Sequence, residues 1–166
     1  KPNAEGSSKG ISDLAVVQSA RALRELLRKN LTLYGQEMLV EQYIPGREFT
    51  VGILGNGQDI HVFEPMEIVY LNRDVPYQIY SFEVKQNYQK YIRYDSPADI
   101  PASLRQEMID TALKIFTLLG CRDFGRIDFR LSPAGELYFI EINPLPGLAP
   151  GYSDYPMLAE FDGLSH

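Results

Sequence analysis

Polar and apolar residues alternate along two neighbouring segments in the last third of the chain. Residues 126–131 read R-I-D-F-R-L, and residues 136–143 read E-L-Y-F-I-E-I-N. Alternation with a period of two is typical of β-strands, and the intervening S-P-A-G has the composition of a tight turn. The pattern therefore predicts a β-hairpin in which four residues form the turn, so that Leu131 pairs with Glu136.

The hairpin gathers polar side chains on one face of the predicted sheet. Side chains along a strand point alternately to its two faces, so Arg126 and Asp128 share a face, as do Glu141 and Asn143. In the predicted register Arg126 lies opposite Glu141, and Asp128 lies opposite Phe139, diagonal to Glu141. Diagonal cross-strand neighbours are roughly 7–8 Å apart and can share a ligand. One face thus carries a guanidinium, two carboxylates and a carboxamide.

This set of groups indicates a binding site for a hard cation. Carboxylate and amide oxygens suit magnesium or manganese better than zinc, and neighbouring carboxylates repel each other unless a cation or a proton lies between them. The alternative is an ordinary hairpin with a charged solvent face. Apolar residues flank Glu141, however, and favour a strand covered on both faces. We therefore predict a metal site formed by Asp128, Glu141 and Asn143.

Two helices are predicted elsewhere in the chain. One begins at Pro101 and ends at Gly120, with an apolar stripe that repeats at helical spacing: Leu104, Met108, Ala112, Ile115, Phe116 and Leu119. The other begins after an N-cap at Ser12 and ends near Asn30.

Further strands are predicted before and after a Pro-Gly break, at residues 38–44 and 48–54. Asn56-Gly57 predicts a tight hairpin into a third strand at residues 59–63. Residues 70–95 show no clear periodicity, and a connection of this length is usually functional or mobile. After Gly147 we expect a loop that returns to apolar residues at Met157.

Composition limits the choice of function. The 166 residues are enough for one domain with a real core. Sixteen Lys and Arg residues against 22 Asp and Glu residues give a net charge of −6, which argues against nucleic-acid binding, including by the tyrosine- and lysine-containing segment 70–95. The single cysteine, Cys121, excludes an internal disulfide framework. No apolar run approaches the length of a membrane span, and no signal peptide is visible, so we expect a cytoplasmic protein.

Two further segments are candidates for binding a nucleotide. Gly6-Ser7-Ser8 lies in a small-residue loop, which can bring backbone N–H groups and hydroxyls to phosphate oxygens, although such a loop is more often a connector. Glu41 and Glu48 bracket the Pro-Gly break and can accept hydrogen bonds from an adenine amino group and from ribose hydroxyls, with Ile44 as an apolar wall. The alternative is a pair of exposed glutamates on strands.

Four motifs then occur in order along the chain. They are K-P-x-x-E-G-S-S-x-G from Lys1, E-x-x-I-x-G-x-E-F-T-V from Glu41, G-R-I-D-F from Gly125 and E-I-N-P-x-P-G from Glu141. Each motif alone is weak, but the four in this order and spacing resemble the ATP-grasp fold, and within it the D-alanine–D-alanine ligase family, over residues 1–157.

The resemblance implies an α+β fold with antiparallel sheets and flanking helices, of which this chain lacks the N-terminal part. Residues 1–68 are then the remainder of the smaller nucleotide-binding subdomain, and residues 69–166 are the C-terminal metal and substrate subdomain. Because the family places part of its site before Lys1, we expect this chain to belong to a longer protein with a more complete site.

The resemblance also implies roles for individual residues. Nucleotide binding is implied for Lys1, Gly6, Ser7, Ser8, Glu41, Ile44 and Glu48, and Lys85 is aligned, less securely, with a lysine near the terminal phosphates. Asp128, Glu141 and Asn143 match the ligands of two magnesium ions, while Arg126 and the backbone N–H of Gly147 match the groups that stabilise a tetrahedral intermediate.

The second-substrate site departs from the family pattern. Ser153 matches the serine that holds the second substrate's carboxylate only with a one-residue insertion, and Asp154 replaces a leucine. An acidic side chain beside a substrate carboxylate weakens its binding by repulsion. We therefore hypothesise that the amine substrate is not D-alanine, or that it is held differently.

The implied activity is an ATP-dependent ligation in peptidoglycan cell-wall synthesis. ATP phosphorylates a carboxylate to an acyl phosphate, and an amine then displaces phosphate to form an amide. The implied cofactors are ATP and Mg²⁺ or Mn²⁺, and the partners are a small carboxylate and a small amine, with no nucleic acid and no membrane. A homodimer is left open. So are two other functions: a nucleotide-binding module without catalysis, and an ATP-grasp kinase of small molecules.

Overall fold

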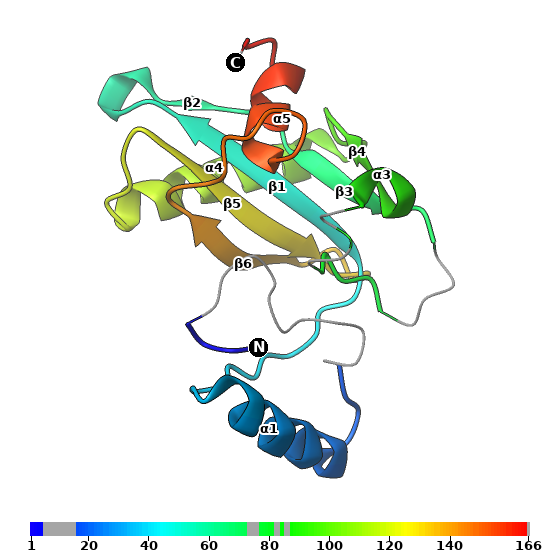
Figure 1. Ribbon diagram of the computed structural model, residues 1–166. Coiled ribbons are helices and arrows are strands. Elements are labelled where there is room, and N and C mark those ends of the chain that lie inside the picture. The colour runs from blue at the N-terminus through cyan, green and yellow to red at the C-terminus, as the bar shows by residue number, and fades with distance from the viewer. Residues whose placement is uncertain (5–15, 73–76, 82–83, 85–86, 166) are drawn as a thin grey trace. The chain divides into compact units, whose positions relative to one another are not determined.

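A computed structural model of the chain describes residues 1–4, 16–72, 77–81, 84 and 87–165. The chain divides into two compact units, shown in Figure 1: Lys1–Pro45 with Tyr70–Arg93, and Gly46–Val69 with Tyr94–His166. The chain passes between them three times, whereas the predicted division is a single one, after residue 68. The assignment of a nucleotide-binding half and a metal and substrate half stays a prediction.

The first unit contains helix α1 (Ala20–Tyr34). Ser19 caps its N-terminus by accepting a hydrogen bond from a first-turn N–H at 3.2 Å, and Gly35 ends it in the left-handed conformation, with φ of 62°. The predicted N-cap, Ser12, lies outside the described residues. Residues 16–19 are not helical, so the predicted start was wrong. The helix begins where the Ser19 hydroxyl accepts a hydrogen bond from one of its first free N–H groups, that of Ala22.

Two other predictions for this unit were wrong. The strand predicted at residues 38–44 does not form, and the segment shows only a single antiparallel bridge, between Met38 and Pro2. The segment 70–95, predicted to be irregular, contains helix α3 (Tyr88–Tyr91) and, where the chain enters the second unit, strand β4 (Ile92–Asp95). Elements of four residues are too short to produce a recognisable period in the sequence.

A sheet organises the second unit. Its strands run in the order β4-β3-β1-β5-β6, with β2 paired to β1. Strand β1 pairs antiparallel with β2, β3 and β5, and β5 pairs antiparallel with β6. The bounds of the strands are β1 (Arg47–Leu54), β2 (His61–Val62), β3 (Met66–Tyr70), β5 (Phe124–Leu131) and β6 (Leu137–Asn143).

The connection from β1 to β2 is longer than predicted. Residues 55–60 join the strands and include a 3-10 turn, η2 (Gly57–Asp59), in place of a two-residue Asn-Gly turn. Gly55 adopts φ of 100°, and a Cβ at this position would lie 2.3 Å from the Asp59 carbonyl oxygen. The connection therefore begins at Gly55, one residue before the Asn-Gly pair, because glycine can adopt this backbone conformation.

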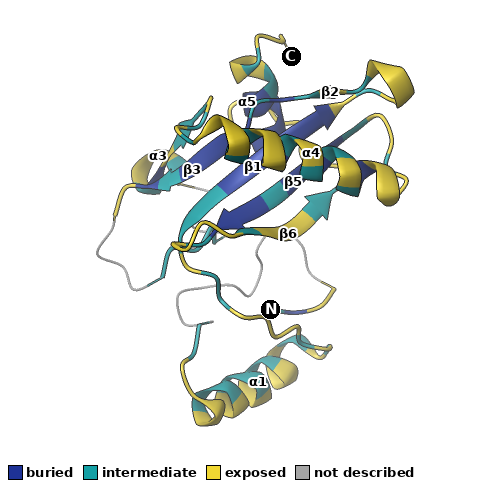
Figure 2. Cartoon of the chain, turned by 180° about the vertical axis from the view of Figure 1, so that it is seen from behind, coloured by how far each residue is buried: buried dark blue, intermediate teal, exposed yellow. Residues whose placement is uncertain are grey.

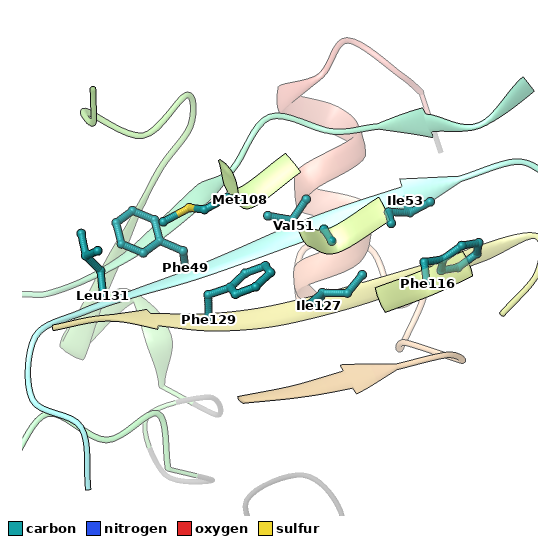
Figure 3. Close-up of a cluster of buried hydrophobic side chains, with 9 residues drawn as sticks. Phe49, Val51, Ile53, Met108, Phe116, Ile127, Phe129 and Leu131 are labelled. Carbon is teal, nitrogen blue, oxygen red and sulfur yellow. The ribbon is translucent and has the colours of Figure 1, made fainter. Parts of the chain in front are cut away.

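Helix α4 (Ala102–Leu118) covers one face of the sheet, as Figure 2 shows. The prediction of this helix is confirmed, with Pro101 at its N-cap and Gly120 in the left-handed conformation after its end. The buried cluster between α4 and the sheet, drawn in Figure 3, consists of Phe49, Val51, Ile53, Met108, Ala112, Phe116, Ile127, Phe129 and Leu131. Leu119 is 61% exposed and does not belong to the stripe predicted for it.

Helix α5 (Asp154–Phe161) packs on the opposite face of the sheet, where the sequence predicted a loop. Tyr155 and Leu158 join Phe63 and Met66 in a second buried cluster. A Cβ on residue 52 would lie 2.4 Å from the Phe63 ring, so Gly52 on β1 allows this close packing. Over the described residues, none of the helices has the length and apolarity needed to cross a membrane.

Tyr155 makes the stability of this packing sensitive to alkaline pH. Its hydroxyl donates to the Ile53 carbonyl at 3.0 Å, and burial raises the pKa of Tyr155 from 10.0 to about 12. The neutral phenol is favoured in the folded state, so its contribution is complete below pH 10 and is lost as pH rises towards 12.

We expect the unfolding free energy of the wild-type protein, measured by urea unfolding, to decrease as pH rises from 10 to about 12. In Tyr155→Phe we expect a smaller decrease over the same pH range. Tyr152→Phe, which removes a tyrosine that is 51% exposed, is the matched control and is expected to retain it. An equal fall in wild type and Tyr155→Phe would contradict the prediction.

Candidate metal centre

The β5–β6 hairpin carries the predicted metal ligands in a register that differs from the predicted one. The turn takes five residues, 132–136, and Leu131 pairs with Leu137 rather than Glu136. Further along, Phe129 pairs with Phe139 but Asp128 pairs with Glu141, so one extra residue on β6 forms a β-bulge. The prediction that Asp128 lies opposite Phe139 was therefore wrong.

The bulge decides which face of the sheet Glu141 and Asn143 occupy. A turn longer by one residue, by itself, would move both side chains to the other face. The extra residue at the bulge shifts the register by a second residue. The two shifts together return Glu141 and Asn143 to the face that carries Arg126 and Asp128. Glu141 thus lies directly opposite Asp128, and Asn143 lies opposite Arg126. The predicted shared face is confirmed, although the predicted pairs are not.

Asp128 is the centre of the hydrogen bonds on this face. Its Oδ1 accepts from Thr50 Oγ1 at 2.7 Å and from Arg126 Nε at 2.9 Å, and its Oδ2 accepts from Arg126 Nη2 at 2.8 Å. The Asn143 amide donates to Asp128 Oδ2 at 3.2 Å and to Glu141 Oε1 at 3.4 Å. One amide group therefore reaches both carboxylates, which places the three predicted ligands side by side.

A buried acidic residue completes this network from the other side of Arg126. Arg126 Nη1 donates to Asp154 Oδ2 at 2.9 Å, and the Tyr94 hydroxyl donates to Asp154 Oδ1 at 2.9 Å. Asp154 is only 5% exposed. The Asp154 carboxylate is thus paired with Arg126, and the hypothesis that it weakens the binding of a substrate carboxylate stays a hypothesis. The sequence pattern did not predict these contacts, since neither Asp154 nor Tyr94 lies near Arg126 in the chain.

The chemistry of the donor set fits a hard divalent cation. Over the described residues, no group of three or more His, Cys, Asp or Glu side chains is arranged to hold a metal ion. The cluster instead offers the carboxylates of Asp128 and Glu141 and the side-chain amide of Asn143. The amide nitrogen of Asn143 now faces the carboxylates, and rotation of the amide group by half a turn would present its oxygen as a metal ligand. Glu141 is exposed and therefore accessible to an ion.

Strand β6 is more exposed than its apolar sequence predicted. In the described part of the chain β6 is an edge strand, and Tyr138, Phe139 and Ile140 are each more than one third exposed. The prediction of a strand covered on both faces was therefore wrong. The case for a site rests on the contacts that Asp128, Glu141 and Asn143 make, and not on burial of the strand.

Glu48 lies on the same face of the sheet as this cluster. It is the residue opposite Arg130, and its Oε2 accepts from Arg130 Nη1 at 3.1 Å. Arg130 also donates to the Gly46 carbonyl at 3.2 Å. The Glu48 side chain is 15% exposed, so the alternative of an exposed strand glutamate does not hold for it. Its predicted contact with a ribose stays a prediction.

The remaining predicted nucleotide residues belong to the other unit or are not described. Lys1 Nζ lies 3.0 Å from Glu41 Oε2, so the structure pairs two residues that the sequence assigned to phosphate and adenine. Ile44 is partly buried. The loop Gly6-Ser7-Ser8 and Lys85 lie outside the described residues. The roles of all these residues stay predictions.

Gly147 and Ser153, predicted for the intermediate and the second substrate, lie together. A Cβ on residue 147 would be 2.6 Å from Ser153 Oγ, so only glycine leaves this serine in place. The Ser153 hydroxyl accepts from the Ala149 N–H at 3.3 Å, and Ser153 occupies the N-cap position of α5. Gly147 and Ser153 are therefore close neighbours, and their roles stay predictions.

Comparison with known proteins gives consistent results. The family model described as "D-ala D-ala ligase C-terminus" matches residues 1–166. A D-alanine–D-alanine ligase of Bordetella petrii is 34% identical over 166 residues, which are 100% of this chain and 48% of that protein. The chain thus spans about half the length of this curated relative.

Two solved structures share the fold. The D-alanyl-alanine synthetase A of Vibrio cholerae aligns with a TM-score of 0.71 and 24% identity over 89% of this chain and 43% of that chain. The VanG D-Ala:D-Ser ligase of Enterococcus faecalis aligns with a TM-score of 0.68 and 24% identity over 93% of this chain and 43% of that chain. The helices and antiparallel strands described above therefore form the C-terminal portion of this fold.

Proposed function

Because this chain belongs to the family of the D-alanine–D-alanine ligase C-terminus, we propose that it is part of an ATP-dependent ligase that joins a small carboxylate to a small amine. The chain spans about half the length of the Bordetella petrii ligase. The proposal therefore concerns the whole protein of which this chain forms a part. The observation that carries it is the cluster of Asp128, Glu141 and Asn143 beside a buried arginine.

In this proposal Asp128, Glu141 and Asn143 hold Mg²⁺ or Mn²⁺. When bound there, the ion would supply positive charge that favours phosphoryl transfer from ATP. Arg126 binds both oxygens of Asp128, which fixes the direction of that carboxylate and limits its rotation. Thr50, through its bond to Oδ1, holds the same carboxylate from the neighbouring strand.

The other residues act on the substrates. Lys1, Glu41, Ile44, Glu48, the loop Gly6-Ser7-Ser8 and Lys85 bind the nucleotide. The carboxylate substrate is phosphorylated to an acyl phosphate, the amine attacks its carbonyl carbon, and phosphate leaves as the amide forms. Arg126 and the Gly147 N–H face the oxyanion that develops at this carbonyl. Ser153 binds the carboxylate of the second substrate.

The amine substrate is left unassigned within this class. The Enterococcus faecalis protein is described as a D-Ala:D-Ser ligase, so proteins with this fold differ in their second substrate. A location in the cytoplasm, a role in cell-wall synthesis and action on small molecules without nucleic acid belong to the same proposal. The homodimer stays open.

The test is phosphate release by the full-length protein. With ATP, Mg²⁺, D-alanine as the first carboxylate and a panel of small amines, we expect phosphate release that is lost when EDTA removes the metal. Added hydroxylamine should trap the acyl phosphate as a hydroxamate. Metal-dependent consumption of ATP with a stable phosphorylated product, and no hydroxamate, would instead indicate a kinase. Nucleotide binding without turnover over a panel of carboxylates and amines would indicate a module without catalysis.

A further inference from the structure

A third carboxylate lies next to the candidate metal centre, on the far side of Arg126. The Arg126 guanidinium donates through Nε and Nη2 to Asp128 and through Nη1 to Asp154. Arg126 is 8% exposed and Asp154 is 5% exposed, so water screens their charges little. The buried cation is thus shared between one carboxylate that faces Glu141 and one that belongs to α5.

The negative charge of Asp154 affects how strongly Asp128 attracts a metal ion, because both carboxylates are bonded to the same guanidinium. A guanidinium bonded to both Asp128 oxygens opposes the attraction between that carboxylate and any other cation, and the opposition is strong where the effective dielectric constant is low. Asp154 supplies a negative charge at 2.9 Å on the other side of the guanidinium. The Arg126–Asp154 pair is then neutral, and Asp128 and Glu141 keep their combined negative charge for a ligand.

Asp154 is also held in a fixed orientation. Its Oδ1 accepts from the Tyr94 hydroxyl at 2.9 Å, while its Oδ2 accepts from Arg126. Burying a carboxylate is costly unless its oxygens are satisfied, and here both have donors. Tyr94 thus contributes orientation to this arrangement, and Asp154 contributes the charge.

We propose that Asp154 is a positioning residue of the metal centre, which balances the charge of Arg126 and thereby strengthens the binding of a divalent cation by Asp128 and Glu141. This inference rests on the proposed function, because it concerns the ion proposed there. It adds a residue outside the predicted ligand set and assigns Tyr94 the supporting role of fixing its carboxylate.

The experiment is Mn²⁺ binding by the full-length protein at saturating ADP, followed by the electron paramagnetic resonance signal of free Mn²⁺. Asp154→Asn keeps the shape of the side chain and removes its charge. We expect it to raise the dissociation constant for Mn²⁺ by about 10-fold, in the range seen when groups that support metal ligands are changed. Tyr94→Phe keeps the charge of Asp154, and we expect a smaller, measurable increase.

The matched control is Asp110→Asn. Asp110 is an exposed residue of α4, bonded to Gln106 at 2.9 Å, and its replacement removes the same formal charge without touching the cluster. We expect this variant to bind Mn²⁺ as wild type does. Thermal unfolding of each variant, followed by circular dichroism, separates loss of metal affinity from loss of fold.

The outcomes are distinct. If folded Asp154→Asn binds Mn²⁺ with wild-type affinity, the inference is overturned and the proposed function is left intact. If Asp154→Asn and Tyr94→Phe lose the same amount of Mn²⁺ affinity, the argument from the charge of Asp154 is overturned. If Asp154→Asn does not fold, wild-type affinity in folded Tyr94→Phe overturns the inference. Absence of Mn²⁺ binding and of metal-dependent phosphate release in wild type would overturn the proposed function together with it.

Discussion

Glu141→Gln is expected to lower metal-dependent ATP turnover by the full-length protein by at least about 100-fold, because Glu141 is a proposed ligand and residues that only orient metal ligands already contribute up to about 100-fold. Glu141 lies opposite Asp128 in the sheet, and its exposed carboxylate is the most accessible negative charge of the cluster. The amide that replaces it has no charge and is a weaker ligand for a hard cation. Phosphate release as a function of Mg²⁺ concentration measures the loss.

The same substitution should leave the fold nearly unchanged. Exchanges at exposed positions usually alter the unfolding free energy by no more than about 0.5 kcal/mol. Glu136→Gln, in the exposed turn of the same hairpin, removes the same charge away from the cluster and should keep wild-type turnover. If Glu141→Gln unfolds the protein, or retains wild-type turnover when folded, Glu141 is a structural or solvent-facing residue and the proposed metal centre is wrong.

Phe129→Ala is expected to produce the largest loss of stability, about 3–5 kcal/mol of unfolding free energy. Phe129 follows Asp128 on β5 but points to the other face, where it is 0% exposed in the cluster beneath α4 (Figure 3). Truncation removes apolar contacts and leaves a cavity that the rigid sheet cannot fill. Urea unfolding followed by circular dichroism measures the loss.

Leu118→Ala is the matched control for this prediction. Leu118 lies at the C-terminal end of α4 and is 74% exposed, so its truncation should change the unfolding free energy by less than about 0.5 kcal/mol. A loss below about 1 kcal/mol for Phe129→Ala, outside the range for buried phenylalanine, would show that this cluster is not the core that supports the hairpin.

Features that depend on local patterns were predictable from the sequence. The stripe after Pro101 predicted α4, since helical spacing places Met108, Ala112 and Phe116 on one side. Alternation predicted β1, β5 and β6, and it also predicted that Asp128, Glu141 and Asn143 share a face. The four motifs together pointed to the family that matches the whole chain.

Features that depend on packing between distant segments were not predictable. The five-residue turn and the bulge on β6 set the hairpin register, and alternation is the same in both registers. Helix α5 is short and follows a Pro- and Gly-containing loop, so its period was not visible. Its position places Asp154 against Arg126, 28 residues earlier in the chain.

The sequence by itself thus determined which polar groups share a face within each strand, Arg126 with Asp128 and Glu141 with Asn143, because side-chain alternation is a property of the strand. Only the tertiary structure decided that these two pairs lie on the same face and which groups touch: a bulge brings Glu141 opposite Asp128, and α5 brings Asp154 to Arg126. The physical reason is that contacts between strands and helices depend on turn length, bulges and the burial of other side chains, which no single segment encodes.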